Sequence, residues 1–399
     1  MLFAAIADDF TGGSDLAGML FEQGVRTVLL FGVTEVPEGY DAAVLCLKTR
    51  SAPAAQARAL SVEALDRLRK RSPRQVQFKY CSTFDSTPEG NIGPVIDELL
   101  SALAASYTVA VPALPVNGRT QYLGHLFVNG VLLNESPMRH HPLNPMADAN
   151  LVRWLQRQTS RCVGLVALPD VQSGRFAVPS GVEIALVDAV TDADLASIAE
   201  AVCDLPLITG GSGLAMKLPG VWRRRGLLPP PAEATLQPPA RPGTLILAGS
   251  CSAATLDQLR AWEESGHEAL SMNVAELGQS EVARLEKAAR AAIAQKGVAL
   301  IRSSAPPDAR LPGSAAAIER AFAELASRLT PAVGKLIVAG GETAGAVVDA
   351  LQLRAVELIA ILDPGVPALR SVDKPHLHLA LKSGNFGSRD FFSKALHHA

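Results

Sequence analysis

The sequence predicts an α/β fold with two domains, each a mostly parallel sheet flanked by helices. Three observations lead to this prediction. The chain has 399 residues, which is too long for one ordinary hydrophobic core. Short apolar runs alternate with helical patterns along the chain, as expected for parallel strands joined by crossover helices. A proline-rich segment interrupts the alternation near residue 229 and separates two halves.

In the first half, eight short apolar runs predict strands. They lie at 3–7, 25–30, 43–47, 75–80, 107–111, 162–167, 183–187 and 205–209. Helical patterns are expected at 15–23, 54–70, 92–104, 149–158 and 192–203. The run 126–133 is an exception, because Asn129-Gly130 between apolar residues predicts a β-hairpin.

The segment 229–243 contains six prolines and is predicted to be a semi-rigid linker between domains at 1–228 and 244–399. After it, strands are expected at 244–248, 269–273, 298–302, 335–339, 355–362 and 377–382. Helices are expected at 254–265, 281–295, 315–329 and 343–351. Two domains joined by one linker form a cleft that suits a reaction of two substrates and excludes water. The active site is therefore expected in the interdomain cleft.

The bulk composition excludes several classes of protein. Net charge at pH 7 is −2, so nothing attracts the chain to nucleic acid or to an anionic membrane. No apolar run approaches the roughly 18 residues that span a bilayer, and the first residues lack the pattern of a secretory signal. The five cysteines show no zinc-site or disulfide spacing. We expect a cytoplasmic protein without a metal-binding motif of its own; a homo-oligomer is compatible with the sequence.

Two adjacent acids, Asp8 and Asp9, form the most informative feature of the chain. They follow the apolar run 3–7 and precede small residues at 11–14. Adjacent carboxylates repel each other and are costly to bury unless they are paired, protonated or bound to a cation. Ligands in open α/β sheets bind at the carboxyl ends of strands. Helix capping explains one acid and leaves the other unexplained, so the pair indicates a site.

Further polar groups of the first half are predicted at the same edge of the sheet. Arg50 can bind a carboxylate in bidentate fashion, although a solvated surface arginine explains it equally well. The segment 79–91 crowds hydroxyls and an acid between a strand and a helix, and capping accounts for only some of them. The segments 117–120 and 208–213 follow further strands.

Four glycine-rich loops follow predicted strands in the second half, at 248–252, 339–345, 363–367 and 382–387. Glycines at strand-to-helix turns let backbone N–H groups converge on phosphate oxygens, and the helix N-terminus adds a favourable field. None of the loops is a P-loop, no G-x-G-x-x-G occurs, and each glycine alone is ordinary turn chemistry. Four such loops at one sheet edge favour a nucleotide or phosphate site.

Taken together, these motifs resemble the four-carbon acid sugar kinase family, and most of all the branch that acts on 3-oxo-tetronate. The resemblance covers nearly the full length. It rests on the segments 6–15, 47–51, 79–93, 115–120, 141–146, 249–252, 340–343 and 382–387.

The resemblance implies a sugar-acid-binding N-terminal domain and a nucleotide-binding C-terminal domain. It implies ATP with Mg²⁺ as donor, and phosphorylation of the terminal (4-) hydroxyl of a four-carbon acid sugar. Nucleotide contacts carry over to Ser250, Ser252, Gly340, Gly341, Glu342, Thr343 and Gly384. Substrate contacts carry over to Asp15, Arg50, Lys79, Asp85, Ser86 and Arg119, together with Asp8 and Asp9. On this basis Asp9 or Asp8 accepts the hydroxyl proton, and Arg50, with Lys79 or Arg119, anchors the substrate carboxylate.

One departure from the family pattern bears on the substrate. Many members read Lys-x-Asp-Ser-Thr-Leu-Arg-Gly where this chain has Thr83 and Glu89 in place of the two cations. The change fits the 3-oxo branch and speaks against the alternative of a D-threonate or D-erythronate 4-kinase. A non-enzymatic sugar-acid-binding protein is a further alternative, but it has no use for four glycine loops. A nicotinamide-dependent oxidoreductase lacks its dinucleotide motif.

Overall fold

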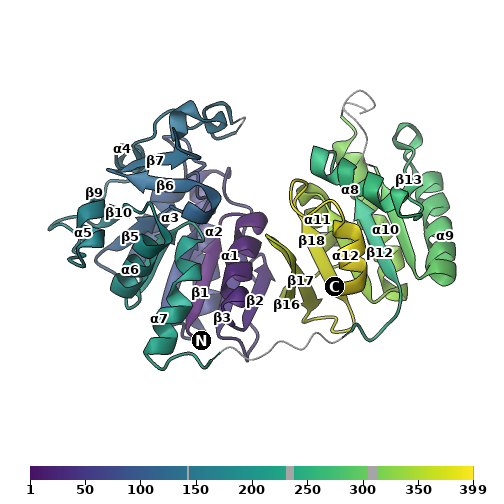
Figure 1. Ribbon diagram of the computed structural model, residues 1–399, viewed down its shortest axis with the longest axis horizontal. Coiled ribbons are helices and arrows are strands. Elements are labelled where there is room, and N and C mark those ends of the chain that lie inside the picture. Colours follow the sequence, from purple (N-terminus) through teal and green to yellow (C-terminus); the bar gives the residue numbers. More distant parts are fainter. Residues whose placement is uncertain (142, 231–237, 304–312, 399) are drawn as a thin grey trace. The chain divides into compact units, whose positions relative to one another are not determined.

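The computed structural model describes residues 1–141, 143–230, 238–303 and 313–398 (Figure 1). The chain divides into two compact units, Met1–Ala232 and Glu233–Ala399. Each is a mostly parallel α/β domain, so the predicted fold class is confirmed. Of the predicted linker, residues 231–237 lie outside the described residues. Within the described residues no helix has both the length and the apolar character to span a bilayer.

Over residues 1–141 and 143–230, the first unit is built on eight parallel strands. Their order is β2 (Thr27–Phe31), β3 (Ala42–Cys46), β1 (Phe3–Ala7), β4 (Gln75–Lys79), β11 (Leu207–Gly210), β5 (Thr108–Val111), β10 (Ile184–Val187) and β9 (Val163–Val166). All five residues of β1 are fully buried, as expected for a strand covered on both faces. The helices are α1 (Phe10–Glu22), α2 (Ala54–Arg69), α3 (Ile92–Ala102), α4 (Leu151–Gln156), α5 (Leu168–Gln172), α6 (Asp192–Val202) and α7 (Leu218–Arg224).

A small antiparallel sheet of β6 (Arg119–Tyr122), β7 (His125–Val128) and β8 (Val131–Leu132) belongs to the same unit. Between β7 and β8, Asn129 and Gly130 have φ values of 51° and 81°, which confirms the predicted hairpin. Buried Asp188, just after β10, holds this sheet by accepting hydrogen bonds from the N–H groups of Leu123 and Gly124 at 2.7 and 3.0 Å. Strand β6 was not predicted, because its polar residues lack an apolar run.

In its described residues the second unit contains seven strands. Their order is β13 (Leu270–Ser271), β14 (Val298–Arg302), β12 (Thr244–Ala248), β15 (Lys335–Ala339), β18 (His378–Lys382), β17 (Val366–Ser371) and β16 (Ala355–Asp363), with β17 antiparallel to both neighbours. The helices are α8 (Ala253–Glu264), α9 (Gln279–Lys296), α10 (Ala315–Leu329), α11 (Gly341–Ala350) and α12 (Phe391–His398). One core cluster joins strand residues such as Ile246 and Ile337 to Trp262 of α8 and Phe392 of α12.

Two expectations about local structure were wrong. Helix α1 begins at Phe10 and not at residue 15, because Asp9 caps it by accepting the Gly12 N–H at 2.8 Å. The glycines in the first turn of α1 do not favour a helix, so the sequence did not indicate this start. They are needed for packing, because a Cβ on Gly13 would lie 2.1 Å from Cys46 Sγ of β3. The loop 363–367 is the hairpin turn between β16 and β17, not a strand-to-helix loop.

Candidate functional site

Strand register brings three charged segments of the first unit to one edge of the sheet. Ala7 at the end of β1 pairs with Cys46 of β3 on one side and with Lys79 of β4 on the other. The residues that follow these strands are therefore level with one another. Asp8, Arg50 and Lys79 meet at the carboxyl edge, where open α/β sheets bind ligands.

Arg50 binds both adjacent acids at once. Its Nε and Nη2 donate to the Asp8 carboxylate at 3.0 and 2.9 Å, and Nη2 also donates to Asp9 Oδ1 at 2.8 Å. Its Nη1 lies 3.9 Å from Asp85 Oδ2. A bidentate guanidinium thus offsets the repulsion and desolvation that make two neighbouring carboxylates unstable on their own.

The two acids differ in their access to solvent. The Asp8 side chain is 5% exposed and that of Asp9 is 27% exposed. Burial raises the pKa of the Asp8 carboxyl, although Arg50 opposes the shift. Burial also acts to lower the pKa of Arg50, but the carboxylates of Asp8 and Asp9 outweigh it and raise that pKa above its usual value. Asp8 is therefore the buried partner that holds Arg50, and Asp9 is the acid that a ligand can reach.

Gly12 marks the point where these charges converge. A Cβ on Gly12 would lie 2.6 Å from Asp9 Oδ1, 2.9 Å from Lys79 Nζ and 3.6 Å from Arg50 Nη2. Lys79 is buried, and its Nζ donates to the Tyr80 carbonyl at 2.8 Å. Glycine at this position therefore lets a carboxylate, an ammonium and a guanidinium approach the backbone of α1 closely.

Asp85, next to this charge cluster, and Asp15, on α1, each accept a hydrogen bond from a hydroxyl. Thr83 Oγ1 donates to Asp85 Oδ1 at 2.7 Å, and Ser212 Oγ donates to Asp15 Oδ2 at 2.6 Å. Thr83, one of the two departures from the family pattern, is thus a neutral partner that orients Asp85.

Ser86 and Arg119 do not join the cluster within the described part of the chain. Ser86 is buried, and its Oγ accepts a hydrogen bond from Gln158 Nε2 at 2.9 Å. Arg119, on β6, donates to the Asn117 carbonyl and to none of the acids described above. Their assignment as substrate contacts stays a prediction.

Asn91, just before α3, is a supporting residue that was not among the predicted site residues. It makes no side-chain cap hydrogen bond to α3. Its buried Nδ2 donates to the carbonyls of Thr49 and Ala52 at 2.6 and 3.1 Å, on either side of Arg50. The sequence signal was its place in the polar segment 79–91, but only the fold shows that it braces the Arg50 loop.

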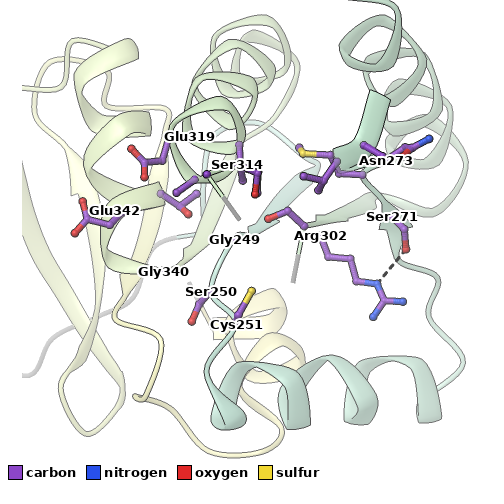
Figure 2. A pocket seen from close by; sticks show the side chains of 18 of the residues that line it. Gly249, Ser250, Cys251, Ser271, Asn273, Arg302, Ser314, Glu319, Gly340 and Glu342 are labelled. Carbon is purple, nitrogen blue, oxygen red and sulfur yellow. Dashed lines mark hydrogen bonds between the residues drawn. The ribbon is translucent and has the colours of Figure 1, made fainter. Parts of the chain in front are cut away.

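The second unit contains a cavity of about 860 Å³ at the carboxyl ends of its parallel strands (Figure 2). Figure 2 shows Ser250 and Cys251 in the loop that leads into α8, and Glu319 and Glu342 on the helices α10 and α11 across the cavity. Among the lining residues are five of the predicted nucleotide contacts: Ser250, Gly340, Gly341, Glu342 and Thr343.

Ser252 and Gly384 are not among the lining residues, but Ser252 belongs to the same loop as Ser250, and Gly384 packs against that loop. Ser252 Oγ donates to the Gly384 carbonyl at 2.5 Å. A Cβ on Gly384 would lie 2.2 Å from Ser250 Oγ, and one on Gly249 would lie 2.1 Å from Thr343 Oγ1. Glycine at these positions lets three loops from different strands pack against one another at the cavity.

Part of the cavity wall escaped sequence reasoning. Ser271, Asn273, Arg302, Ser314 and Glu319 also line it. Arg302 points toward Ser271, whose Oγ accepts its Nε–H at 3.1 Å (Figure 2). These residues lie at or just after the ends of β13 and β14, or at the start and in the second turn of α10, and no glycine-rich turn marks them in the sequence. The third predicted loop, 363–367, does not line the cavity.

Comparison with known proteins assigns a class to each unit. Residues 3–218 match a family described as a sugar-binding N-terminal domain, and residues 245–392 match one described as a nucleotide-binding C-terminal domain. A Cupriavidus necator protein named 3-oxo-tetronate kinase is 46% identical, over 99% of this chain and 96% of the relative. A Pseudomonas fluorescens protein of the same name is 48% identical with the same coverage. The crystal structure of a Haemophilus influenzae protein has a TM-score of 0.88 at 40% identity and covers 99% of both chains.

Proposed function

We propose that this chain, which belongs to the four-carbon acid sugar kinase family, transfers the γ-phosphoryl group of ATP to the 4-hydroxyl of 3-oxo-tetronate. The chain is a phosphotransferase with a hydroxyl acceptor, as its kinase relatives are. The observation that carries the proposal is the pairing of two built sites in one chain. A charge cluster lies in the sugar-binding unit, and a glycine-lined cavity lies in the nucleotide-binding unit.

The cavity of the second unit has the features that ATP phosphates need. Gly340 precedes α11 and Gly341 begins it, and a Cβ on Gly341 would meet no atom within 4 Å, so the positive end of the helix dipole and free space meet at Gly341. Ser250 adds a hydroxyl from the neighbouring loop. Glu319 and Glu342 offer carboxylate oxygens of the kind that Mg²⁺ prefers. When bound with the phosphates, Mg²⁺ supplies neutralisation of their charge.

The charge cluster of the first unit suits a polyhydroxy acid. Carboxylates accept hydrogen bonds from hydroxyls, and Asp9 is the accessible acid of the pair. We assign Asp9 the role of accepting or orienting the proton of the reacting hydroxyl, and Asp8 the role of fixing Arg50. Nε and Nη2 of Arg50 already donate to Asp8 and Asp9. The groups that we expect to bind the substrate carboxylate are therefore Nη1 of Arg50, Lys79 and Arg119.

We propose that Thr83 helps to determine which sugar acid the enzyme accepts. It orients Asp85 with a neutral hydroxyl at 2.7 Å, at the position where the family pattern that the sequence resembles has a lysine. A neutral group lowers the positive charge around Asp85, and by the family resemblance this departure accompanies the 3-oxo branch. Glu89, the second departure, is exposed and has no such contact within the described residues.

The position of the new phosphate tests the proposed reaction. We expect the product of ATP and 3-oxo-tetronate to be a phosphate monoester on C4, whose ³¹P resonance is split by the two adjacent C4 protons. A phosphate on any other carbon would contradict the assignment. A chain that neither binds ATP in calorimetry nor yields product would favour the sugar-acid-binding alternative.

A bulky residue at position 341 should block the nucleotide specifically. A Cβ on Gly341 would meet no atom within 4 Å, so a Gly341→Leu side chain extends into the cavity without a clash in the fold. We expect the KM for ATP to rise by about tenfold or more, equivalent to about 1.4 kcal/mol of binding free energy. Steady-state kinetics with varied ATP measure the change.

Gly220→Leu in α7 is a matched control, because a Cβ there also meets no atom closer than 3.7 Å but lies in the sugar-binding unit. It should leave the KM for ATP unaltered. An unchanged KM for ATP in the Gly341→Leu variant would remove this loop from the nucleotide site.

A further inference from the structure

Lys382, the last residue of β18, is a buried cation beneath the glycine-rich loop 382–387 of the nucleotide-binding unit. Its side chain is 1% exposed. The Nζ donates to Thr255 Oγ1 at 3.1 Å and to the carbonyls of Ser383 and Gly384 at 3.3 and 3.2 Å. It also lies 5.8 Å from the ring centroid of Phe391. Within the described residues no carboxylate pairs with it, and burial lowers its pKa to about 8.

Carbonyl groups of the loop that follows Lys382 accept hydrogen bonds from buried side chains of the unit. Besides Lys382, the hydroxyls of Ser252 and Thr255 donate to the Gly384 carbonyl, at 2.5 and 2.9 Å. Further along, buried Gln258 Nε2 donates to the carbonyls of Phe386 and Gly387 at 3.0 and 2.9 Å. Side chains from α8 and β18 thus hold the loop from beneath.

Inward carbonyls turn the next N–H groups outward. In a planar trans peptide the C=O and the following N–H point in opposite directions. With the carbonyls of Ser383 and Gly384 drawn inward, the N–H groups of Gly384 and Asn385 face the other way. In the part of the chain that the structure describes, neither N–H has a hydrogen-bond acceptor. The loop lies against Ser250, because a Cβ on Gly384 would sit 2.2 Å from Ser250 Oγ.

We propose that Lys382 is a positioning residue for the nucleotide phosphates. Its ammonium holds the carbonyls of Ser383 and Gly384 inward. The N–H groups of Gly384 and Asn385 are thereby presented to an anion beside Ser250. The inference rests on the proposed function. The ammonium has a second effect. Its positive charge is not neutralised by an acid and lies in a low-dielectric interior, where it favours an anion above the loop.

A comparison of ADP with adenosine tests this role in a Lys382→Met variant. Methionine keeps the apolar stem against Phe391 but removes the ammonium. We expect the Kd of ADP to rise by about tenfold or more, the Kd of adenosine to change little, and the KM of the sugar acid to stay the same. A general loss of structure would weaken both ligands alike. Calorimetry and steady-state kinetics supply the values.

Lys335→Met is the matched control. Lys335 begins the neighbouring strand β15, at the opposite end of the sheet, and its Nζ donates to the Leu396 carbonyl at 2.8 Å. It should leave the binding of ADP unchanged. If Lys382→Met does not fold, Thr255→Val removes the hydroxyl shared by Lys382 Nζ and the Gly384 carbonyl, and should weaken ADP but not adenosine.

Unchanged ADP binding in a folded Lys382→Met variant would overturn the inference, as would equal weakening of ADP and adenosine. If Lys382→Met does not fold, unchanged ADP binding in Thr255→Val would overturn it. Absence of ADP binding by the unmodified chain would be a different failure, since it would remove the nucleotide site itself and with it the proposed function.

Discussion

Replacing Asp9 with asparagine is expected to lower kcat by about 10²–10⁴-fold, the usual contribution of a general base. Asn is as good a helix cap as Asp, so the hydrogen bond to the Gly12 N–H and the start of α1 should survive. The negative charge that accepts or orients the hydroxyl proton is lost. Because the nucleotide cavity belongs to the other unit, the Kd of ATP should stay close to its original value. Steady-state kinetics and ATP calorimetry measure both quantities.

Asp41→Asn is the control for the loss of one acidic charge. Asp41 pairs with Arg26, whose side chain is 70% exposed, and it follows no strand at the carboxyl edge. It should leave kcat unaltered. Unchanged turnover in a folded Asp9→Asn variant would remove Asp9 from the mechanism, and a parallel loss of ATP binding would point to damaged structure.

The Arg50→Met substitution is expected to lower the stability of the fold strongly, which is the second large effect. The variant leaves the Asp8 carboxylate, 5% exposed, without its bidentate partner, and removes the donor that Asp9 shares. Loss of one partner of a buried ion pair typically costs about 3–5 kcal/mol. We expect a decrease of that order in the free energy of unfolding, measured by denaturant titration. Arg26→Met, at an exposed pair, should cost no more than about 1 kcal/mol.

The deficit of Arg50→Met should depend on pH in a defined direction. Burial already raises the pKa of Asp8, and Arg50 opposes this shift, so the variant should have a still higher Asp8 pKa. An acid whose folded pKa exceeds its unfolded value, about 4, destabilises the fold as pH rises through that range. The difference in the free energy of unfolding between Arg50→Met and the unmodified chain should therefore be largest at neutral pH and shrink toward pH 4. A deficit that grows on acidification would contradict the assignment of buried charge to Asp8.

Most of the fold follows from local patterns in the sequence. The ends of β1, β3 and β4 were predicted to within one residue, because continuous apolar runs are typical of buried parallel strands. Asn129-Gly130 likewise predicted its hairpin from turn chemistry alone. Strand β17 and helix α12 were missed. The former follows the hairpin turn at Gly365, which resembled a ligand loop, and the latter is a short C-terminal segment whose place depends on packing against α8.

The site was predictable in position but not in its internal contacts. Asp8, Asp9 and Arg50 were placed at one sheet edge, as observed. That one guanidinium engages both acids depends on strand register, which a single sequence does not reveal. Lys382 illustrates the same limit. Nothing local distinguishes a lysine that ends a strand from a solvated one, and its burial depends on α8 and α12 closing over it.

The most direct test of the proposed function is the release of ADP by the purified chain with ATP and Mg²⁺, in parallel with 3-oxo-tetronate, D-threonate and D-erythronate. Of the three acids, we predict that only 3-oxo-tetronate causes release of ADP above background. Turnover of D-threonate or D-erythronate instead would contradict the substrate and the role of Thr83. No turnover with any of the three would contradict the proposed reaction.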